Sequence, residues 1–258
     1  MKLKYQVKSA LNKLKRRLWA NNSPLIKFYY QNIWHPAAGT LSAFLDDFSK
    51  NNKNIFFIQV GSNDGIQHDP LSKFIKRDHW QGIMIEPQKE AFRHLSFAYK
   101  NENITPLNIA ISDIDGSKKL YKIAFSNERW ASGISSFLKS QVEAQIDNGH
   151  VGRMCKKYGI TPPANKADYI TYEEVACLSF PTLFERYKVG KVDILHIDTE
   201  GFDFEIIKLF DFNRFLPKVV IYEHTHLSKE DKAACQHFLQ KKGYAIRTYN
   251  ADTVAFIS

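Results

Sequence analysis

From about residue 55 to its end, the chain alternates short apolar, β-branched runs with amphipathic runs of helical character. Strands that alternate with helices build parallel sheets, because each crossover helix returns the chain to the same edge of the sheet. The pattern therefore predicts an α/β fold with a doubly wound, mostly parallel sheet. A short turn joins the last two strands, which predicts an antiparallel pair at the end of the sheet. The predicted strands cover residues 55–60, 82–86, 104–111, 192–198, 218–224, 244–249 and 253–258.

The helices between these strands carry start and stop signals. Proline stands in the first turn of three of them, where its missing N–H costs no hydrogen bond. The last helix begins at a serine cap and stops at a glycine. These helices cover residues 70–77, 87–100, 202–210 and 228–243, and one further short helix starts at Pro181.

Two segments stand apart from the regular alternation. We expect residues 116–125 to supply the turn and strand of a local hairpin. The polar stretch 124–169 is predicted as an irregular, lid-like insertion. Residues 51–258 would then form one domain, preceded by a basic, amphipathic helical extension over residues 1–50.

The basic charge of the chain is concentrated at its N-terminus. Residues 1–20 hold seven of the 36 Lys and Arg residues and no acid, which leaves 29 basic against 27 acidic residues elsewhere. A nearly neutral body argues against nucleic-acid binding, which needs clustered cations. The terminal segment predicts a helix that either packs on the protein itself or makes peripheral contact with an anionic membrane. Its apolar residues recur on one helix face: Leu3, Val7, Leu11, Leu14 and Leu18.

Several features of the sequence indicate a cytoplasmic protein. No run approaches the roughly 20 apolar residues that cross a bilayer, and the N-terminus lacks the apolar centre of a secretion signal. The three cysteines, Cys155, Cys177 and Cys235, lie far apart and are odd in number. That pattern suits a reducing compartment and suggests neither a disulfide framework nor a zinc site. Peripheral attachment at the inner membrane surface is the alternative.

Polar residues gather where the predicted strands end. In an open α/β sheet, ligands bind beyond the carboxyl ends of the strands, near the point where the strand order reverses. The sequence therefore predicts a ligand site built from five strand ends. Its candidates are Gly61, Ser62, Asn63, Asp64 and Gly65 after the first strand, Glu86 after the second, Asn108, Ala110 and Asp113 around the third, Asp198, Glu200 and Asp203 after the fourth, and Glu223, His224 and His226 after the fifth.

Glu86 and the first loop indicate the class of ligand. Glu86 follows Gly65 by 21 residues, at the end of the next strand, where a carboxylate accepts hydrogen bonds from ribose hydroxyls. The loop reads G-S-N-D-G and lacks the third glycine that a dinucleotide pyrophosphate needs. Asp64 would repel a diphosphate but favours a cationic ligand. Adenosine with a cationic amino-acid arm is S-adenosylmethionine, which we therefore predict as the cofactor.

The chain also resembles the FkbM-type S-adenosylmethionine-dependent methyltransferases over residues 55–258. The resemblance rests on "IQVGSNDG", "GIMIEP", "PLNIAISDIDG", "GISSF", "DILHIDTEGFDFEII" and "YEHTHLS", in that order. It implies a Rossmann-like class I methyltransferase fold, with a seven-stranded sheet whose last strand is antiparallel. It also implies O-methylation of a hydroxyl group, on a sugar, a glycan or a glycosylated metabolite.

The shared motifs extend the predicted cofactor site. They add Pro87, Ser135 and Ser136 to the strand-end residues. One position departs from the family pattern: Gln59 stands where methyltransferases often carry an acid before the glycine loop. The departure suggests that Asp64 or Asp198 holds the methionine amine instead.

A hydroxyl acceptor also requires a base, because an alcohol is about as weak an acid as water. The candidates are Asp198, Glu200, Glu223 and His224. We favour His224 or Asp198, since a neutral imidazole accepts a proton near pH 7; a purely structural role is the alternative for His224 and for Glu200. A divalent metal is a further alternative, with Asp198, Glu223, His224 and His226 as ligands. The spacing of the two histidines would aim both side chains the same way on a strand.

The insertion is placed where it would cover the acceptor. An aromatic ring with arginines and hydroxyls suits a sugar or an anionic glycan, although these residues could equally form a packed surface loop. The candidate contacts are Arg129, Trp130, Ser135, Ser136 and Arg153.

Two other functions compete with methyl transfer. An NAD-linked sugar oxidoreductase would need a pyrophosphate loop and a Tyr-x-x-x-Lys pair near the strand ends, and no convincing example is found there. A membrane-surface binding protein with an inactive methyltransferase-like domain would explain the basic N-terminus. The intact set of Gly61, Asp64, Glu86 and Asp198 argues against lost activity.

Overall fold

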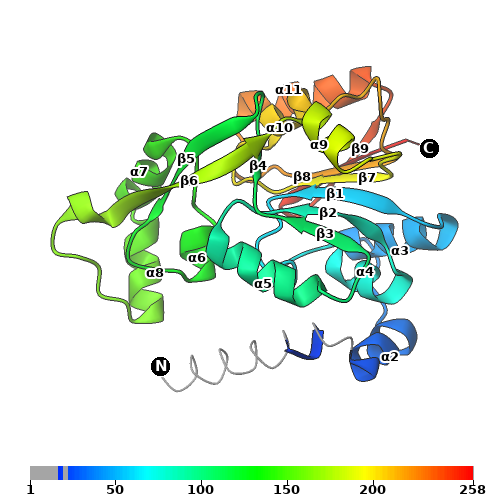
Figure 1. Ribbon diagram of the computed structural model, residues 1–258, viewed down its shortest axis with the longest axis horizontal. Coiled ribbons are helices and arrows are strands. Elements are labelled where there is room, and N and C mark those ends of the chain that lie inside the picture. Colours follow the sequence, from blue (N-terminus) through cyan, green and yellow to red (C-terminus); the bar gives the residue numbers. More distant parts are fainter. Residues whose placement is uncertain (1–16, 20–22, 258) are drawn as a thin grey trace.

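A computed structural model describes residues 17–19 and 23–257 of the chain (Figure 1). The predicted amphipathic stripe at Leu3, Val7, Leu11 and Leu14 lies outside the described residues. In the described part of the chain, no helix is both long and apolar enough to span a membrane.

The centre of the fold is a seven-stranded sheet in the order β3-β2-β1-β7-β8-β10-β9. The neighbours from β3 to β8 are parallel, whereas β10 runs antiparallel to both β8 and β9. This arrangement confirms the predicted mostly parallel sheet with an antiparallel last strand. The strands are β1 (Phe56–Val60), β2 (Gln81–Ile85), β3 (Ile104–Leu107), β7 (Ile194–Ile197), β8 (Val219–Glu223), β9 (Ala245–Tyr249) and β10 (Asp252–Phe256).

Helices cover both faces of this sheet, so the fold is doubly wound as predicted (Figure 1). Strand residues alternate between two cores because successive side chains point to opposite faces: Phe57 joins one core and Ile58 the other. One face packs against α3 (Leu41–Asn51), α4 (Ser72–Asp78) and α5 (Lys89–Tyr99), and the other against α9 (Phe180–Arg186), α10 (Asp203–Leu209) and α11 (Lys229–Lys241).

A second, three-stranded sheet corrects two expectations from the sequence. It has the order β4-β6-β5, with β4 (Ala110–Ile111), β5 (Gly116–Ile123) and β6 (Ile170–Leu178). The predicted strand 104–111 therefore splits between the two sheets. The prediction of a local hairpin at residues 116–125 is also wrong, because β5 pairs along its whole length with β6, which follows the insertion in sequence.

The insertion between β5 and β6 is helical rather than irregular. It contains α6 (Arg129–Ser132), α7 (Lys139–Asp147), α8 (His150–Tyr158) and the 3-10 helix η1 (Lys166–Tyr169). Buried apolar residues, among them Trp130 and Val142, give it a small core of its own. The sequence did not predict these helices, because the segment is polar and α7 and α8 each bury only one or two apolar side chains.

Candidate active site

A cavity of about 680 Å³ opens at the carboxyl ends of β1, β2 and β7. The chain runs outward from β1 to β2 and β3 on one side and returns to β7 and β8 on the other, so the strand order reverses between β1 and β7. Ligands of open α/β sheets bind at such a switch point. The insertion closes the cavity from the opposite side with α6 and residues 126–137.

Gly61 brings the ends of β1 and β7 into close contact. Its φ of +83° is left-handed, and a Cβ at this position would lie 1.8 Å from the backbone oxygen of Asp198. Its N–H and that of Ser62 both donate to the Ile85 carbonyl at 3.0 Å, which ties the loop to β2 as well. Only glycine fits this conformation and this contact.

The side chain of Glu86 is a buried carboxylate on the cavity wall. Its Oε2 accepts a hydrogen bond from the Asn63 N–H at 2.8 Å, and its Oε1 accepts one from the Gln88 N–H at 2.9 Å. Burial raises its pKa to about 7, although these two hydrogen bonds act in the opposite direction. Each carboxylate oxygen can accept a further hydrogen bond. Asn108 supports this turn from outside the cavity, donating to the carbonyls of Glu86 and Pro87 at 2.9 Å each.

The side chain of Asp64 forms its hydrogen bonds mainly within its own loop. Its Oδ1 accepts hydrogen bonds from the N–H groups of Ile66 at 3.0 Å and Gln67 at 2.9 Å, while its Oδ2 accepts one from the Gln67 side chain. The guanidinium of Arg129 lies 3.7 Å from Oδ1. Asp64 therefore holds the loop in shape, whereas Asp198 lies on the cavity wall, where burial raises its pKa.

The insertion is attached directly to the Glu86 turn. The side chain of Gln88 donates to the Ser132 carbonyl at 3.0 Å and accepts from the Ser135 hydroxyl at 3.1 Å. Asn63 donates to the Ser132 hydroxyl at 3.3 Å. These contacts place Arg129 and Trp130 in the cavity wall.

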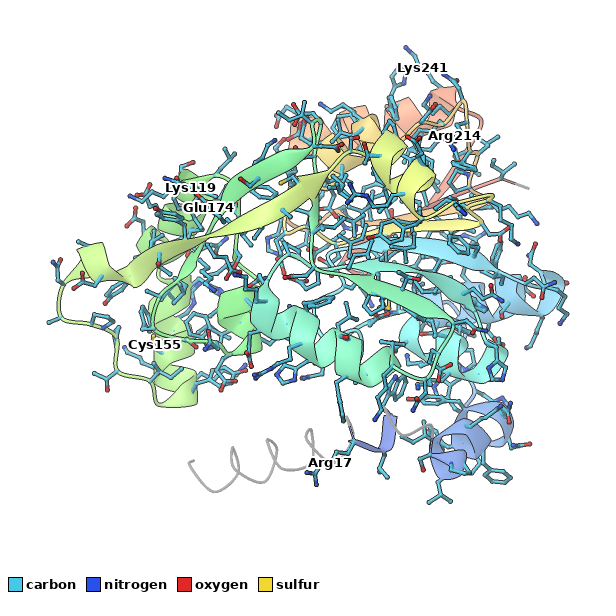
Figure 2. All side chains as sticks on the ribbon, in the orientation of Figure 1. Arg17, Lys119, Cys155, Glu174, Arg214 and Lys241 are labelled. Atoms are coloured by element: carbon cyan, nitrogen blue, oxygen red, sulfur yellow. The ribbon has the colours of Figure 1, made fainter. Side chains whose placement is uncertain are left out.

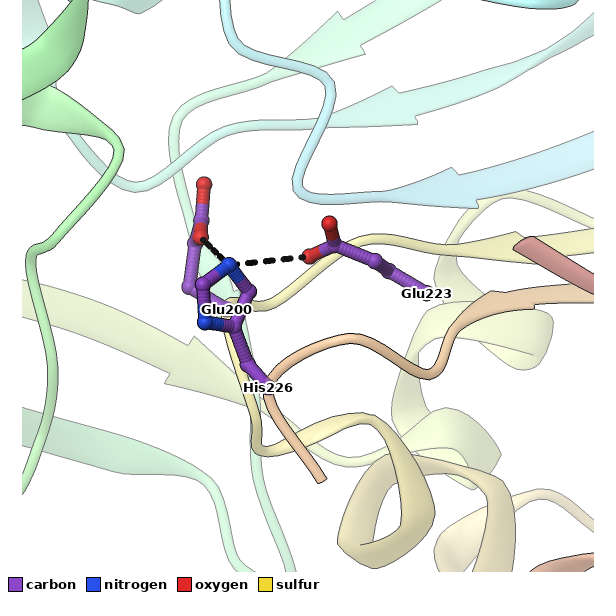
Figure 3. Close-up of side chains that lie close together, drawn as sticks. All are labelled: Glu200, Glu223 and His226. Carbon is purple, nitrogen blue, oxygen red and sulfur yellow. Dashed lines mark ion pairs between the residues drawn. The ribbon is translucent and has the colours of Figure 1, made fainter. Parts of the chain in front are cut away.

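Two carboxylates and one imidazole lie close together (Figure 3), and all three interact electrostatically with Asp198. The Nε2 atom of His226 is 3.2 Å from Oε2 of Glu200 and 3.7 Å from Oε2 of Glu223. Glu200 has a left-handed φ of 55°, which lets the loop after β7 turn back over the cavity. Asp203 fixes this loop from below, accepting hydrogen bonds from Thr199 and Gly201 and from the N–H of Glu223.

Carboxyl groups outnumber the basic side chains in the cavity wall. Six carboxylates line it, against Arg129 and a Lys122 that is already paired with Glu173 at 3.0 Å. Burial raises the pKa of Asp198, and burial together with the neighbouring Asp198 charge raises that of Glu200 and of Glu223. Burial lowers the pKa of His226, so its imidazole is neutral near pH 7. Such a cluster favours a cationic ligand.

Comparison with known proteins decides the family. The model of the methyltransferase FkbM domain matches residues 59–246, which is most of the chain. The chain belongs to the FkbM methyltransferase family. This match confirms the resemblance found in the sequence motifs. No curated protein matches the chain.

Solved structures similar to this FkbM-family chain are distant in sequence. The methyltransferase FkbM from Methylobacillus flagellatus KT is 12% identical, with a TM-score of 0.48, over 89% of this chain and 50% of that one. This chain thus spans half of that protein. A fibrillarin from Aeropyrum pernix, solved with natively bound S-adenosyl-L-methionine, is 11% identical with a TM-score of 0.41, over 92% and 76% of the two chains.

Most of the residues predicted for the site of this FkbM-family chain line the cavity. Some that do not line it support the wall from behind, as Asn108 and Asp203 do. The lining includes Gly61, Asn63, Asp64, Glu86, Pro87, Ala110, Arg129, Trp130, Ser135, Ser136, Asp198, Glu200 and His226, whereas Ser62, Gly65, Asn108, Asp113, Arg153, Asp203, Glu223 and His224 lie outside it.

Three expectations from the sequence need correction. His224, the favoured base, faces β10 rather than the cavity, because its Nδ1 lies 3.0 Å from the Thr253 hydroxyl. The chain turns immediately after β8, so His224 and His226 diverge and cannot form the predicted metal pair. Arg153 bonds to the Asn148 carbonyl at the start of α8 instead of facing an acceptor.

Sequence reasoning missed two contributors to the site. Gln88 and Ser132 join the insertion to the Glu86 turn, although neither belongs to a motif with a known chemical role. Gln88 directly follows the "GIMIEP" motif, and this position was the one signal available. Ser132 could not be found from the sequence, because its contact depends on how the insertion folds back.

Proposed function

We propose that this chain is an S-adenosylmethionine-dependent O-methyltransferase that acts on a hydroxyl of a sugar, a glycan or a glycosylated metabolite. The observation that carries the proposal is the cavity itself, which combines the buried Glu86 carboxylate with the acidic group around Asp198. The Glu86 side of the wall would accept hydrogen bonds from the ribose of an adenosine, and the acidic side around Asp198 would bind a cation.

The residues of the cavity fit S-adenosylmethionine. Small-molecule sites commonly measure about 300–1,000 Å³, which includes this cavity. The remaining lone pairs of Glu86 would accept hydrogen bonds from the ribose hydroxyls. Gly61 lets the end of β1 approach the Asp198 backbone closely. The Asp198 carboxylate would pair with the ammonium group of the methionine arm. When bound, the cofactor supplies a methyl group already activated by the sulfonium charge.

The proton of the acceptor would be taken by Glu200, supported by His226. The ordinary carboxylate is a weak base, and its strength rises with its pKa. Burial and the neighbouring carboxylates raise the pKa of Glu200. Its Oε2 is held by Nε2 of His226 at 3.2 Å, which orients the group and leaves Oε1 directed towards the insertion at Gly133. Glu223 lies on the far side of the imidazole and would stabilise it when it carries a proton.

A sugar acceptor agrees with the wall that the insertion contributes. The edge of the largely buried Trp130 side chain lines this wall together with polar side chains that donate and accept hydrogen bonds. Carbohydrates present the same combination of C–H faces and hydroxyl edges. The polar residues on this side include Ser126, Asn127, Gln145 and His150.

Calorimetric titration with S-adenosylmethionine tests the cofactor. We expect binding to the wild-type chain, and at least about tenfold weaker binding in Glu86→Gln, equivalent to about 1.4 kcal/mol. Glu205→Gln is the matched control, because Glu205 is an exposed acid on α10 paired with Lys208. Thermal unfolding establishes that each variant is folded. Absence of heat with the wild type, or equal affinity in the folded Glu86 variant, would reject the assignment.

A chelator tests the alternative of a metal-assisted reaction. Donor atoms of Glu200, Glu223 and His226 lie within 4.8 Å of one another, which is close enough for a shared ion. The imidazole already occupies the space between the two carboxylates, so we expect methyl transfer to survive treatment with EDTA. Activity that disappears with EDTA and returns with Mg²⁺ or Mn²⁺ would instead assign these residues to a metal.

A further inference from the structure

Helix α2 (Pro24–Asn32) carries apolar side chains on two opposite faces. The inner face packs on the body of the protein through Ile26, Tyr30 and Trp34. The ring of Tyr30 lies 5.7 Å from that of Trp34, which in turn lies 5.8 Å from Phe74 on α4. This contact fixes the orientation of α2, so the opposite face must point away from the body (Figure 1).

The opposite face, which we call the outer α2 face, consists of Leu25, Phe28, Tyr29 and Ile33. Their exposed fractions are 77%, 57%, 45% and 57%. Spacings of three, one and four residues place them on one stripe of the helix. They are four of the ten large hydrophobic residues that are exposed in the described part of the chain. Single exposed apolar residues are common, but a contiguous stripe indicates a surface that is covered by something else.

The charge around this face indicates what covers it. The first acidic residue of the sequence is Asp46, and the 45 residues before it carry eight Lys and Arg residues. One of them, Lys27, lies on the side of α2 that faces the body, where its Nζ is 2.9 Å from Nε2 of His79. Arg17 lies at the same edge of the molecule as α2 (Figure 2), and the neighbouring Trp19 ring is 5.8 Å from Tyr30. The eight are Lys2, Lys4, Lys8, Lys13, Lys15, Arg16, Arg17 and Lys27.

We propose that the outer α2 face binds the surface of an anionic lipid bilayer. Its leucine, isoleucine and aromatic side chains would enter the boundary between headgroups and acyl chains, and the acid-free basic segment would contact the anionic headgroups. Each basic residue close to such a surface adds about 1 kcal/mol of attraction. A nucleic acid would leave the apolar stripe exposed, and a second copy of the chain would bring two basic segments together.

Vesicle sedimentation tests this surface. We expect the full chain to sediment with vesicles of phosphatidylcholine and phosphatidylserine, and much less with phosphatidylcholine alone. The double variant Leu25→Ser and Phe28→Ser should bind the anionic vesicles at least tenfold more weakly, although it keeps every basic residue. The matched control is Ile114→Ser with Leu216→Ser, because these two side chains are 64% and 53% exposed on other parts of the fold. That variant should sediment as the wild type does.

Three results would overturn the proposal. They are failure of the wild type to bind anionic vesicles, equal binding by the Leu25 and Phe28 variant, and a dimer in solution that this variant converts to monomers without any vesicle binding. Thermal unfolding shows whether both variants are folded, and titration with S-adenosylmethionine is a separate measurement. The titration keeps this test separate from the proposed methyl transfer, because a membrane-bound chain that binds no cofactor would fail only the latter.

Discussion

Gly61 shows how a single residue determines whether the cavity exists. Its left-handed φ and its contact with the Asp198 backbone exclude any side chain. We therefore expect Gly61→Ala to lower the free energy of unfolding by at least ~3 kcal/mol, because both strain and a backbone clash result. Gly152→Ala is the control, since nothing lies within 4 Å of its added Cβ and helix α8 favours alanine. Chemical denaturation of both variants measures the difference; similar midpoints would contradict the structure.

Gln59, the position that departs from the family pattern, has a structural role. Its side chain is buried in β1 and donates a hydrogen bond to Oδ2 of Asp69 at 3.0 Å. Asp69 in turn accepts hydrogen bonds from the N–H groups of Leu71 and Ser72 at the start of α4. Burial raises the pKa of Asp69 to about 6. An amide at position 59 therefore avoids a second buried carboxylate next to this one.

Gln59→Glu should make the stability strongly dependent on pH. Two buried carboxylates repel each other, so their folded pKa values rise above the unfolded ones and the folded state binds more protons. The penalty is then small at about pH 5 and grows to about 2–4 kcal/mol near pH 8. Denaturation across this range measures it. Adding Asp69→Asn should restore much of the loss, because the donor and acceptor are exchanged; an equal loss at both pH values would contradict this role.

At the scale of elements, the sequence predicted the seven central strands because each is a short apolar run of the correct period. It failed where pairing is set by tertiary contacts. Residues 110–111 look like the end of β3, yet they join β6 after a turn at Asn108. Likewise, the sequence located many of the strand-end residues that line the cavity, but it could not distinguish His224 from His226. Their directions depend on the turn after β8.

The attachment of the insertion to the Glu86 turn gives an element-scale prediction. Gln88→Ala removes the hydrogen bonds to Ser132 and Ser135 but keeps the backbone N–H that donates to Glu86. We expect faster proteolysis within residues 124–169 and about tenfold weaker cofactor binding, with a loss of stability below about 1 kcal/mol. Gln240→Ala, an exposed position on α11, is the control. Unchanged proteolysis and affinity would show that the insertion is held by its apolar core alone.

Across the whole molecule, charge is divided into two regions. The first 45 positions carry eight basic residues and no acid, whereas six carboxylates line the cavity. This division separates the two proposed contacts, with an anionic membrane and with a cationic cofactor. A uniformly mixed surface would favour neither. The division also makes the cofactor affinity depend on the ionisation of the cavity.

The affinity for S-adenosylmethionine should therefore rise with pH. Asp198, Glu200 and Glu223 have raised pKa values, so increasing pH ionises them and adds negative charge near the bound cation. His226 has a lowered pKa and stays neutral over the same range. S-adenosylhomocysteine carries the same adenosine and amino-acid arm without the sulfonium charge, so its affinity should rise less. The pKa of Glu223 is raised to about 8 and that of Glu200 to about 9, so we expect the ratio of the two dissociation constants to widen severalfold between about pH 7 and about pH 9.5, measured by calorimetry.

Glu200→Gln provides the control for this measurement, because it removes one titrating carboxylate while keeping the size of the side chain. The pH dependence for S-adenosylmethionine should become shallower in this variant, and that for S-adenosylhomocysteine should change less. Wild-type curves that run parallel for the two ligands would mean that the carboxylates do not act on the sulfonium. The carboxylates would then interact only with the amino group of the cofactor or with the acceptor. The position of the methyl group relative to Glu200 would have to be assigned differently.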